Sequence, residues 1–146
     1  GDELRLGPAR GELVLAEGST RDVLLIAGGT GLAAARALFA VLARRAGDQR
    51  RVRLLVGVGG DEAARDLADL EAIRRGGAQP QRLSITPVGG VGESDAWFVR
   101  EAAARDGRGW VDREVYVSGS ARMTHETLRI LQELGVPVEQ VHRDRY

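Results

Sequence analysis

The chain has 146 residues, with 21 basic and 21 acidic side chains, no cysteine and two histidines. This neutral balance argues against a nucleic-acid partner, and the lack of cysteine excludes disulfides and thiolate chemistry. All the basic residues are arginine, which also excludes Schiff-base chemistry and a Walker A lysine.

The length corresponds to about one domain. No apolar run approaches the roughly 18 residues that cross a bilayer, and no signal peptide is evident, so we expect a cytoplasmic protein without a membrane segment in this chain. His125 and His142 lie far apart in the sequence, which argues against a histidine-based metal site.

The first 20 residues differ in pattern from the rest. They contain short extended pieces around Gly7 and Gly11, an expected strand at 13–15 and a loop at 17–20. From residue 22 onward, apolar runs alternate with segments of helical periodicity. The expected strands cover residues 23–26, 52–58, 83–88, 114–118 and 138–143, and the expected helices cover 32–42, 61–74, 94–105 and 121–134.

Each expected helix has an apolar face. The run at 23–26, Val-Leu-Leu-Ile, is apolar throughout, as is typical of a parallel strand that is buried on both sides. In the third helix, we expect Trp97 and Phe98 to face the sheet. The apolar faces of the other helices are Leu32, Ala35, Leu38, Phe39 and Leu42, then Ala64, Leu67, Leu70 and Ile73, and finally Met123, Thr127, Leu131 and Leu134.

This alternation predicts an α/β fold: a doubly wound, Rossmann-like, five-stranded parallel sheet with helices on both faces. Such sheets bind ligands at the carboxyl ends of their strands, where the winding direction reverses. We therefore expect the site on the loops after residues 27, 58, 88 and 118. Three of these loops contain clustered glycines, and the fourth contains Gly119.

The loop after the first strand is Gly-Gly-Thr-Gly at 28–31, and residues 29–34 fit the form G-x-G-x-x-A. Exposed N–H groups at the start of the following helix would face a diphosphate, whose charge the helix dipole favours. Thr30 would cap the helix or donate to a phosphate. The alternative is a tight turn that binds no ligand.

The loop after the fourth strand places a small residue and a glycine before an expected helix cap, Ser118, Gly119 and Ser120. A second helix start beside the first would suit an elongated dinucleotide. The alternative is that both serines serve the turn and the cap alone. Without a G-x-S-x-G elbow, Ser118 is not a convincing hydrolase nucleophile.

Four segments resemble the ferredoxin–NADP⁺ reductase-like enzymes. Residues 25–33 resemble the family segment IAGGTGLAP, and 115–120 with Met123 resemble VYVCGSPxM. Residues 135–142 resemble the closing GVPxExIH, and 2–11 resemble the exit from the flavin-binding barrel. The four segments match in order and spacing over nearly the whole chain.

The resemblance implies a remnant of the FAD-binding barrel and a linker at 1–20, and an NAD(P)-binding domain at 21–146. It places Ser118 at the family cysteine, near the nicotinamide and the flavin, and Tyr146 at a C-terminal aromatic that stacks on the flavin. The implied cofactor-binding residues are Gly28, Gly29, Thr30, Gly31 and Leu32 for the diphosphate and nicotinamide side, Gly57, Val58 and Val88 for the adenosine half, and Gly119, Ser120 and Met123 closing over the cofactor.

Some positions depart from the family. Ala34 and Ala121 replace prolines, and Ser118 replaces the cysteine, which would slow or abolish hydride transfer. No arginine follows the third strand at 89–91 to grip a 2′-phosphate, which favours NADH over NADPH. The flavin-anchoring Arg-x-Tyr-Ser/Thr segment belongs to the missing barrel, so we expect this chain alone to be inactive and to bind flavin poorly or not at all.

The resemblance therefore implies the NAD(P)H-binding module of a flavin-dependent oxidoreductase. Its partners would be an FAD-binding domain of the same protein and a haem, iron–sulfur or other redox acceptor. The departures leave open a non-catalytic dinucleotide-sensing domain. A response-regulator-like binding module is a second alternative, although the acidic pair expected at the end of the first strand is missing. We also expect Gly31→Val to weaken cofactor binding and to spare the fold.

Overall fold

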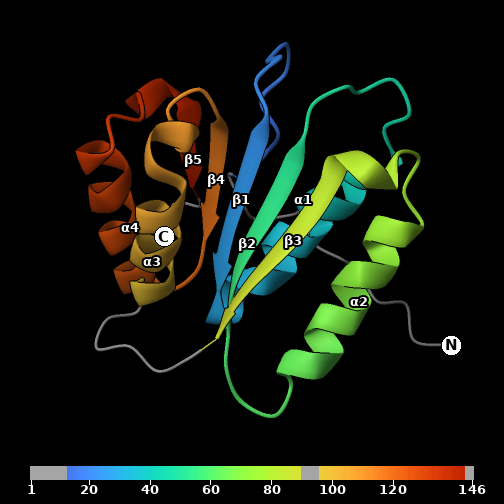
Figure 1. The fold of residues 1–146 in the computed structure, drawn as a ribbon, viewed down its shortest axis with the longest axis horizontal. Coiled ribbons are helices and arrows are strands. Elements are labelled where there is room, and N and C mark those ends of the chain that lie inside the picture. Colours follow the sequence, from blue (N-terminus) through green and yellow to red (C-terminus); the bar gives the residue numbers. More distant parts are fainter. Residues whose placement is uncertain (1–12, 90–95, 144–146) are drawn as a thin grey trace, which may run out of the picture.

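The computed structural model describes residues 13–89 and 96–143, and it has a five-stranded parallel sheet in the order β3-β2-β1-β4-β5 (Figure 1). The predicted doubly wound α/β fold is thereby confirmed. The strands are β1 (Val23–Gly28), β2 (Val52–Val58), β3 (Leu83–Gly89), β4 (Glu114–Ser118) and β5 (Val141–Arg143). The helices are α1 (Leu32–Arg44), α2 (Ala63–Arg75), α3 (Trp97–Asp106) and α4 (Ala121–Glu133), with 3₁₀ turns η1 (Gly29–Gly31), η2 (Pro80–Arg82), η3 (Gly107–Trp110) and η4 (Val138–Gln140).

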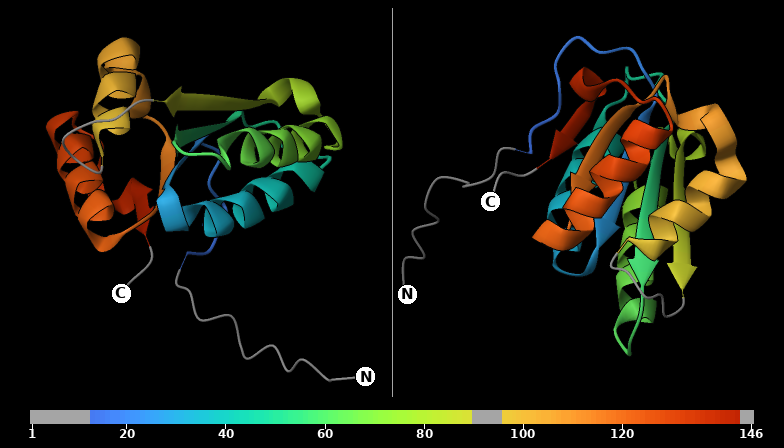
Figure 2. Two further views of the ribbon diagram at one scale, coloured as in Figure 1. Left: turned by 90° about the horizontal axis from the view of Figure 1, so that it is seen from below. Right: turned by 90° about the vertical axis from the view of Figure 1, so that its left-hand side faces the viewer.

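The position of β1 at the centre of the sheet explains why its sequence is apolar throughout. Leu24 and Ile26 are buried in the core cluster beneath α3 and α4, and Val23 and Leu25 are buried in the cluster beneath α1 and α2. Figure 2 shows these helices on the two faces of the sheet. Burying each such side chain contributes about 1.5–3 kcal/mol.

The strand order fixes the point at which the winding reverses. The chain passes from β1 to β2 and β3 on one side, and then returns to place β4 against the other side of β1. The reversal therefore lies between β1 and β4. Their carboxyl ends point toward the lower side of Figure 1.

Two helix predictions have different outcomes. The end of α4 is confirmed, because Gly135 has a φ of 82° and Val136 N–H donates to the Leu131 carbonyl oxygen at 3.0 Å. The face of α2 is only partly confirmed. Leu70 is buried, but Ala64 is exposed, because α2 contacts the sheet through its later turns rather than its first.

Two strand predictions are wrong in part. Residues 13–15 form no strand: Leu13 and Leu15 pack their side chains against the core beneath α1 and α2. Residues 138–140 form η4, because Gln140 N–H donates back to the Pro137 carbonyl oxygen at 3.0 Å, and the strand begins only at Val141. The remaining residues of the expected barrel remnant, 1–12, lie outside the described residues.

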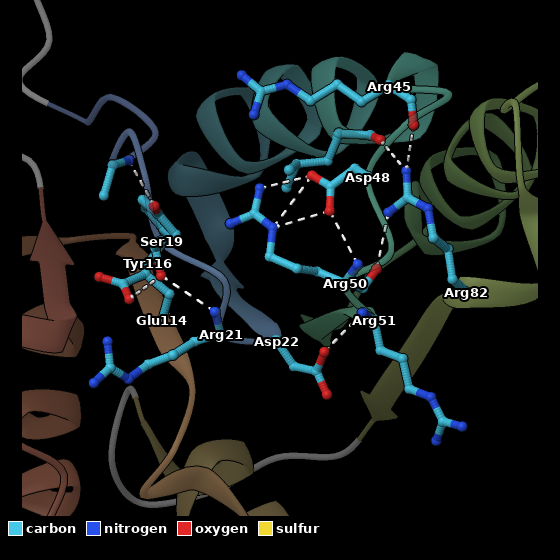
Figure 3. A network of polar contacts seen from close by, with 12 residues as sticks. Ser19, Arg21, Asp22, Arg45, Asp48, Arg50, Arg51, Arg82, Glu114 and Tyr116 are labelled. Carbon is cyan, nitrogen blue, oxygen red and sulfur yellow. Dashed lines mark hydrogen bonds and ion pairs between the residues drawn. The ribbon is translucent and has the colours of Figure 1, made fainter.

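Arginines hold the amino edge of the sheet together. The buried Arg82 guanidinium donates to the carbonyl oxygens of Leu42 at 2.7 Å, Arg45 at 3.0 Å and Arg50 at 3.0 Å, which ties the end of α1 to the start of β2 (Figure 3). These carbonyls include the negative end of the α1 dipole, which favours a cation there. Nearby, Arg50 Nη2 lies 2.7 Å from Asp48 Oδ2.

We expect Asp48→Asn to lower stability at pH 7 and to flatten the acid dependence of folding. The hydrogen bond from Arg50 lowers the pKa of Asp48 from 3.8 to about 2. A carboxyl group whose folded pKa is depressed stabilises the fold above about pH 4 and loses that contribution as the pH falls to about 2. Urea unfolding should show a loss of about 1 kcal/mol at pH 7, which disappears near pH 2.

The matched control is Asp112→Asn, at an exposed carboxyl group outside the ion pairs of the described residues. It should stay within about 0.5 kcal/mol of the wild type at pH 7. A loss in Asp48→Asn that persisted at pH 2 would contradict the proposed contribution of the ion pair.

Candidate functional site

The carboxyl ends of four strands bring the sequence-predicted residues to one edge of the sheet. Gly28 pairs with Gly57 and Gly57 with Val88, so these residues stand side by side in β1, β2 and β3. Ala27 of β1 pairs with Ser118 of β4. The loops that follow β1 and β4 therefore begin next to each other at the reversal of winding, the usual ligand position in such sheets.

The turn between β1 and α1 leaves the start of α1 without a capping side chain. Gly29 has a φ of 52°, which favours glycine, and Gly31 is the N-cap residue of α1. The first turn of α1 contains no acidic residue. The positive end of the helix dipole is therefore not offset by a side chain of its own first turn, an arrangement that favours an external anion. The side chain of Thr30 lies outside what the structure describes.

Gly31 joins the two loops by close contact. A Cβ atom added to Gly31 would lie 2.1 Å from the carbonyl carbon and oxygen of Ser118, and 2.3 Å from the backbone nitrogen of Gly119. Glycine is therefore required here by the protein's own backbone. The expectation that Gly31→Val spares the fold is contradicted, because the collision is with backbone atoms rather than with a space left for a ligand.

The loop after β4 starts the second helix as predicted. Ser120 is the N-cap residue of α4, and its hydroxyl accepts a hydrogen bond from Met123 N–H at 3.1 Å. The first turn of α4 likewise has no acidic residue. A Cβ on Gly119 would lie 2.1 Å from Met123 Sδ and 3.4 Å from the Gly28 carbonyl oxygen, so Gly28, Gly119 and Met123 meet in one place.

Phe98 is a residue of this site that sequence reasoning did not assign to it. Its ring fills the space that side chains at Gly28 and Gly57 would occupy: an added Cβ would lie 3.3 Å from Phe98 Cε1 at Gly28 and 2.8 Å from Cδ1 at Gly57. Phe98 is 2% exposed. These two glycines therefore make room for a protein ring, and a ligand would meet their backbone from beyond the strand ends. The sequence signal for this packing was the presence of glycine, Gly28 and Gly57, near the ends of two expected strands.

The remaining predicted residues differ in accessibility. Ser118 is 3% exposed, and Val88 and Met123 are buried as well. The side chains of Leu32 and Val58 are partly buried and pack against the core beneath α1 and α2. Tyr146 lies outside the described residues.

The residues predicted for this site offer backbone amides and small or apolar side chains. Apart from Tyr146, the predicted site residues are glycine, threonine, leucine, valine, serine and methionine, and none of these serves as an acid or base near neutral pH. Within 13–89 and 96–143, no three His, Asp or Glu side chains gather to hold a metal ion. In the same ranges, no helix is both long and apolar enough to span a bilayer.

Comparison with solved proteins finds structures of similar fold. A ferredoxin reductase in carbazole 1,9a-dioxygenase, in its FAD apo form, is 25% identical with a TM-score of 0.67, and the match covers 88% of this chain and 36% of that one. The chain is therefore similar in structure to this ferredoxin reductase. A second structure, of the ferredoxin reductase in carbazole 1,9a-dioxygenase, gives 23% identity and a TM-score of 0.69, covering 90% of this chain and 40% of the other.

More distant in sequence is the ferredoxin-NADP⁺ reductase from Plasmodium falciparum, at 17% identity and a TM-score of 0.67, covering 87% of this chain and 52% of that one. No protein-family model and no curated protein sequence matches the chain. The chain thus spans between 36% and 52% of these three solved chains. Their shared part is the α/β sheet with its helices.

Proposed function

We propose that the chain binds NAD(P)H across the carboxyl ends of β1 and β4 and presents the nicotinamide to a flavin held by another domain. One observation carries the proposal: Gly31 lies in close contact with the backbone of Ser118 and Gly119. This contact brings the starts of α1 and α4 together at the reversal of winding, and neither helix has an acidic residue in its first turn. Such helix starts attract a shared diphosphate. The similarity to flavin-dependent reductases supports a redox role for this binding.

In this proposal, each part of the cofactor meets a different strand end. The diphosphate lies at the backbone of Gly29, Gly31 and Leu32. The adenosine extends toward Gly57, Val58 and Val88, while the nicotinamide lies toward Ser118, with Gly119, Ser120 and Met123 beside it. Thr30 and Tyr146 retain the roles that the resemblance implies. The support for this orientation is the register that sets Gly28, Gly57 and Val88 in one row and Ser118 on the other side of β1.

We propose NADH as the preferred nucleotide. No arginine occurs among the described residues between β2 and α2 or at the end of β3. Asp61 and Glu62, in contrast, are exposed at the carboxyl end of β2. A 2′-phosphate in the adenosine position would be repelled by these carboxylates, and these loop residues offer no guanidinium to bind it bidentately.

A flavin does not fit the described residues. The anchoring Arg-x-Tyr-Ser/Thr stretch does not occur in the sequence. A flavin, when bound by its own domain, accepts hydride from the nicotinamide. This chain's contribution would be to bind and orient the dinucleotide. We propose that its partners are a flavin-binding domain and a final acceptor, which is a haem, iron–sulfur or protein centre.

The test is a stopped-flow experiment on a protein in which this chain follows its flavin domain. NADH should bleach the flavin absorbance, and NADPH should do so at least about tenfold more slowly at equal concentration. Ser118→Cys, which restores the family residue, should accelerate bleaching if Ser118 stands beside the nicotinamide. No bleaching with either nucleotide would contradict the redox function.

A second candidate function is non-catalytic dinucleotide sensing. Ser118 stands at the position of the family cysteine, and only 3% of it is exposed, which favours a structural role over a reactive one. NADH binding without bleaching, in wild type and Ser118→Cys alike, would support sensing in place of reduction.

A further inference from the structure

Residues 13–20, here called the strap, lead into β1 from the amino edge of the sheet, at the top of Figure 1. The strap is fastened to β4 by two hydrogen bonds. Ala16 N–H donates to the Tyr116 hydroxyl at 2.9 Å, and the Ser19 hydroxyl donates to Glu114 Oε2 at 2.9 Å (Figure 3). The strap therefore reaches a strand almost 100 residues away in the sequence.

The same two β4 side chains also bind β5. Glu114 is 4% exposed, and its Oε1 lies 2.6 Å from His142 Nε2. The rings of Tyr116 and His142 stack with their centroids 4.7 Å apart and an interplanar angle of 20°. Ser19, Glu114, Tyr116 and His142, with the backbone of Ala16, thus form one cluster, here called the clasp, that joins the strap, β4 and β5.

Leu13 and Leu15 of the strap pack against the core beneath α1 and α2, whereas residues 16–20 line open space on the side away from β4. An open cleft of about 820 Å³ separates Ala16, Ser19 and their neighbours from Arg45 and the turn at 47–50. The hydrogen bonds of Ala16 and Ser19 therefore hold this part of the strap to β4. β4 in turn ends at Ser118, two residues after Tyr116 and next to the proposed nicotinamide position.

We propose that the clasp is a positioning device for hydride transfer. Resting on the proposed function, the strap is the segment through which the flavin-binding part joins this domain. By fixing the strap to the strand that ends at Ser118, the clasp sets where the flavin stands relative to the nicotinamide. Reacting atoms must come within about 3–3.5 Å, so a small displacement of one domain lowers the rate without changing nucleotide binding.

The experiment uses the flavoprotein in which this chain follows its flavin domain, with the double variant Ser19→Ala/Tyr116→Phe. The hydrogen bonds of Ala16 and Ser19 to β4 are lost in this variant, while the residues proposed to bind NADH are untouched. We expect NADH affinity within about twofold of the wild type and flavin reduction slower by about tenfold or more. The matched control is Thr20→Ala, an exposed strap residue outside the clasp, which should reduce flavin at the wild-type rate.

Two further measurements separate positioning from simple loss of structure. Amide hydrogen exchange should rise in residues 13–20 of the double variant and stay unchanged in β1 and β2. Ser19→Thr, which restores the hydroxyl, should recover a faster rate than Ser19→Ala. Unchanged exchange in the strap, or unchanged flavin reduction with intact NADH binding, would contradict the clasp proposal without contradicting the proposed function. If the wild type binds no NADH, the proposed function fails and the clasp proposal fails with it.

Discussion

Gly31→Val is expected to destabilise the fold by about 3 kcal/mol and to abolish measurable NADH binding. The valine Cβ would stand 2.1 Å from the Ser118 carbonyl, a backbone group that cannot rotate away as a side chain does. The loops after β1 and β4 must therefore separate, which disrupts the anion site that they are proposed to share. Urea unfolding followed by tryptophan fluorescence and calorimetric titration with NADH measure the two effects.

The matched control for this substitution is Gly47→Ala. A Cβ at Gly47 meets nothing within 4 Å, and its φ is not in the left-handed region. Stability should therefore stay within about 0.5 kcal/mol of the wild type, and NADH binding should be retained. A Gly31→Val protein with wild-type stability and affinity would show that the two loops do not meet as described.

Phe98→Ala is expected to cost about 3–5 kcal/mol of unfolding free energy. The ring is buried between α3 and the ends of β1 and β2, where Gly28 and Gly57 have no side chains that would fill the cavity left behind. Phe98→Leu should lose less, because it leaves a smaller cavity. Both are measured by urea unfolding at pH 7.

Val138→Ala supplies the control for apolar truncation, since Val138 is 83% exposed. Its loss should not exceed about 0.5 kcal/mol. A loss below about 1 kcal/mol in Phe98→Ala would mean that the ring does not support the strand ends in solution.

Periodicity predicted the central elements well because their burial is two-sided and uniform. β2 was expected at 52–58 and β4 at 114–118, and the structure has both at these bounds. Prediction was weaker at the periphery. Val138 and Val141 are strand formers, but Pro137 and the hydrogen bonds of the Gln140 side chain to the Val111 and Arg113 carbonyl oxygens favour a turn at 138–140.

In the candidate site, features that depend on neighbouring residues were predicted, and features that depend on tertiary packing were not. The tight turn at 28–31 and the Ser120 cap followed from the sequence, because each depends on residues close along the chain. The expected Thr30 cap is wrong, because Gly31 is the N-cap residue of α1 and no side chain caps it. The contact of Gly31 with Ser118 and the ring of Phe98 over Gly57 did not follow from the sequence, because they depend on how separate loops and helices pack. The same holds for the strap, whose Ser19 meets Glu114 across 95 positions.

The most direct test of the central claim is an amide-resolved NMR titration of this chain with NADH. The account predicts saturable shifts of the backbone amides of Gly29, Gly31 and Leu32 together with those of Gly119 and Ser120, because both helix starts would face the same diphosphate. Smaller shifts at Gly57 and Val58 should mark the adenosine. No shifts at millimolar NADH, or shifts confined to the cleft beside Arg45, would contradict it.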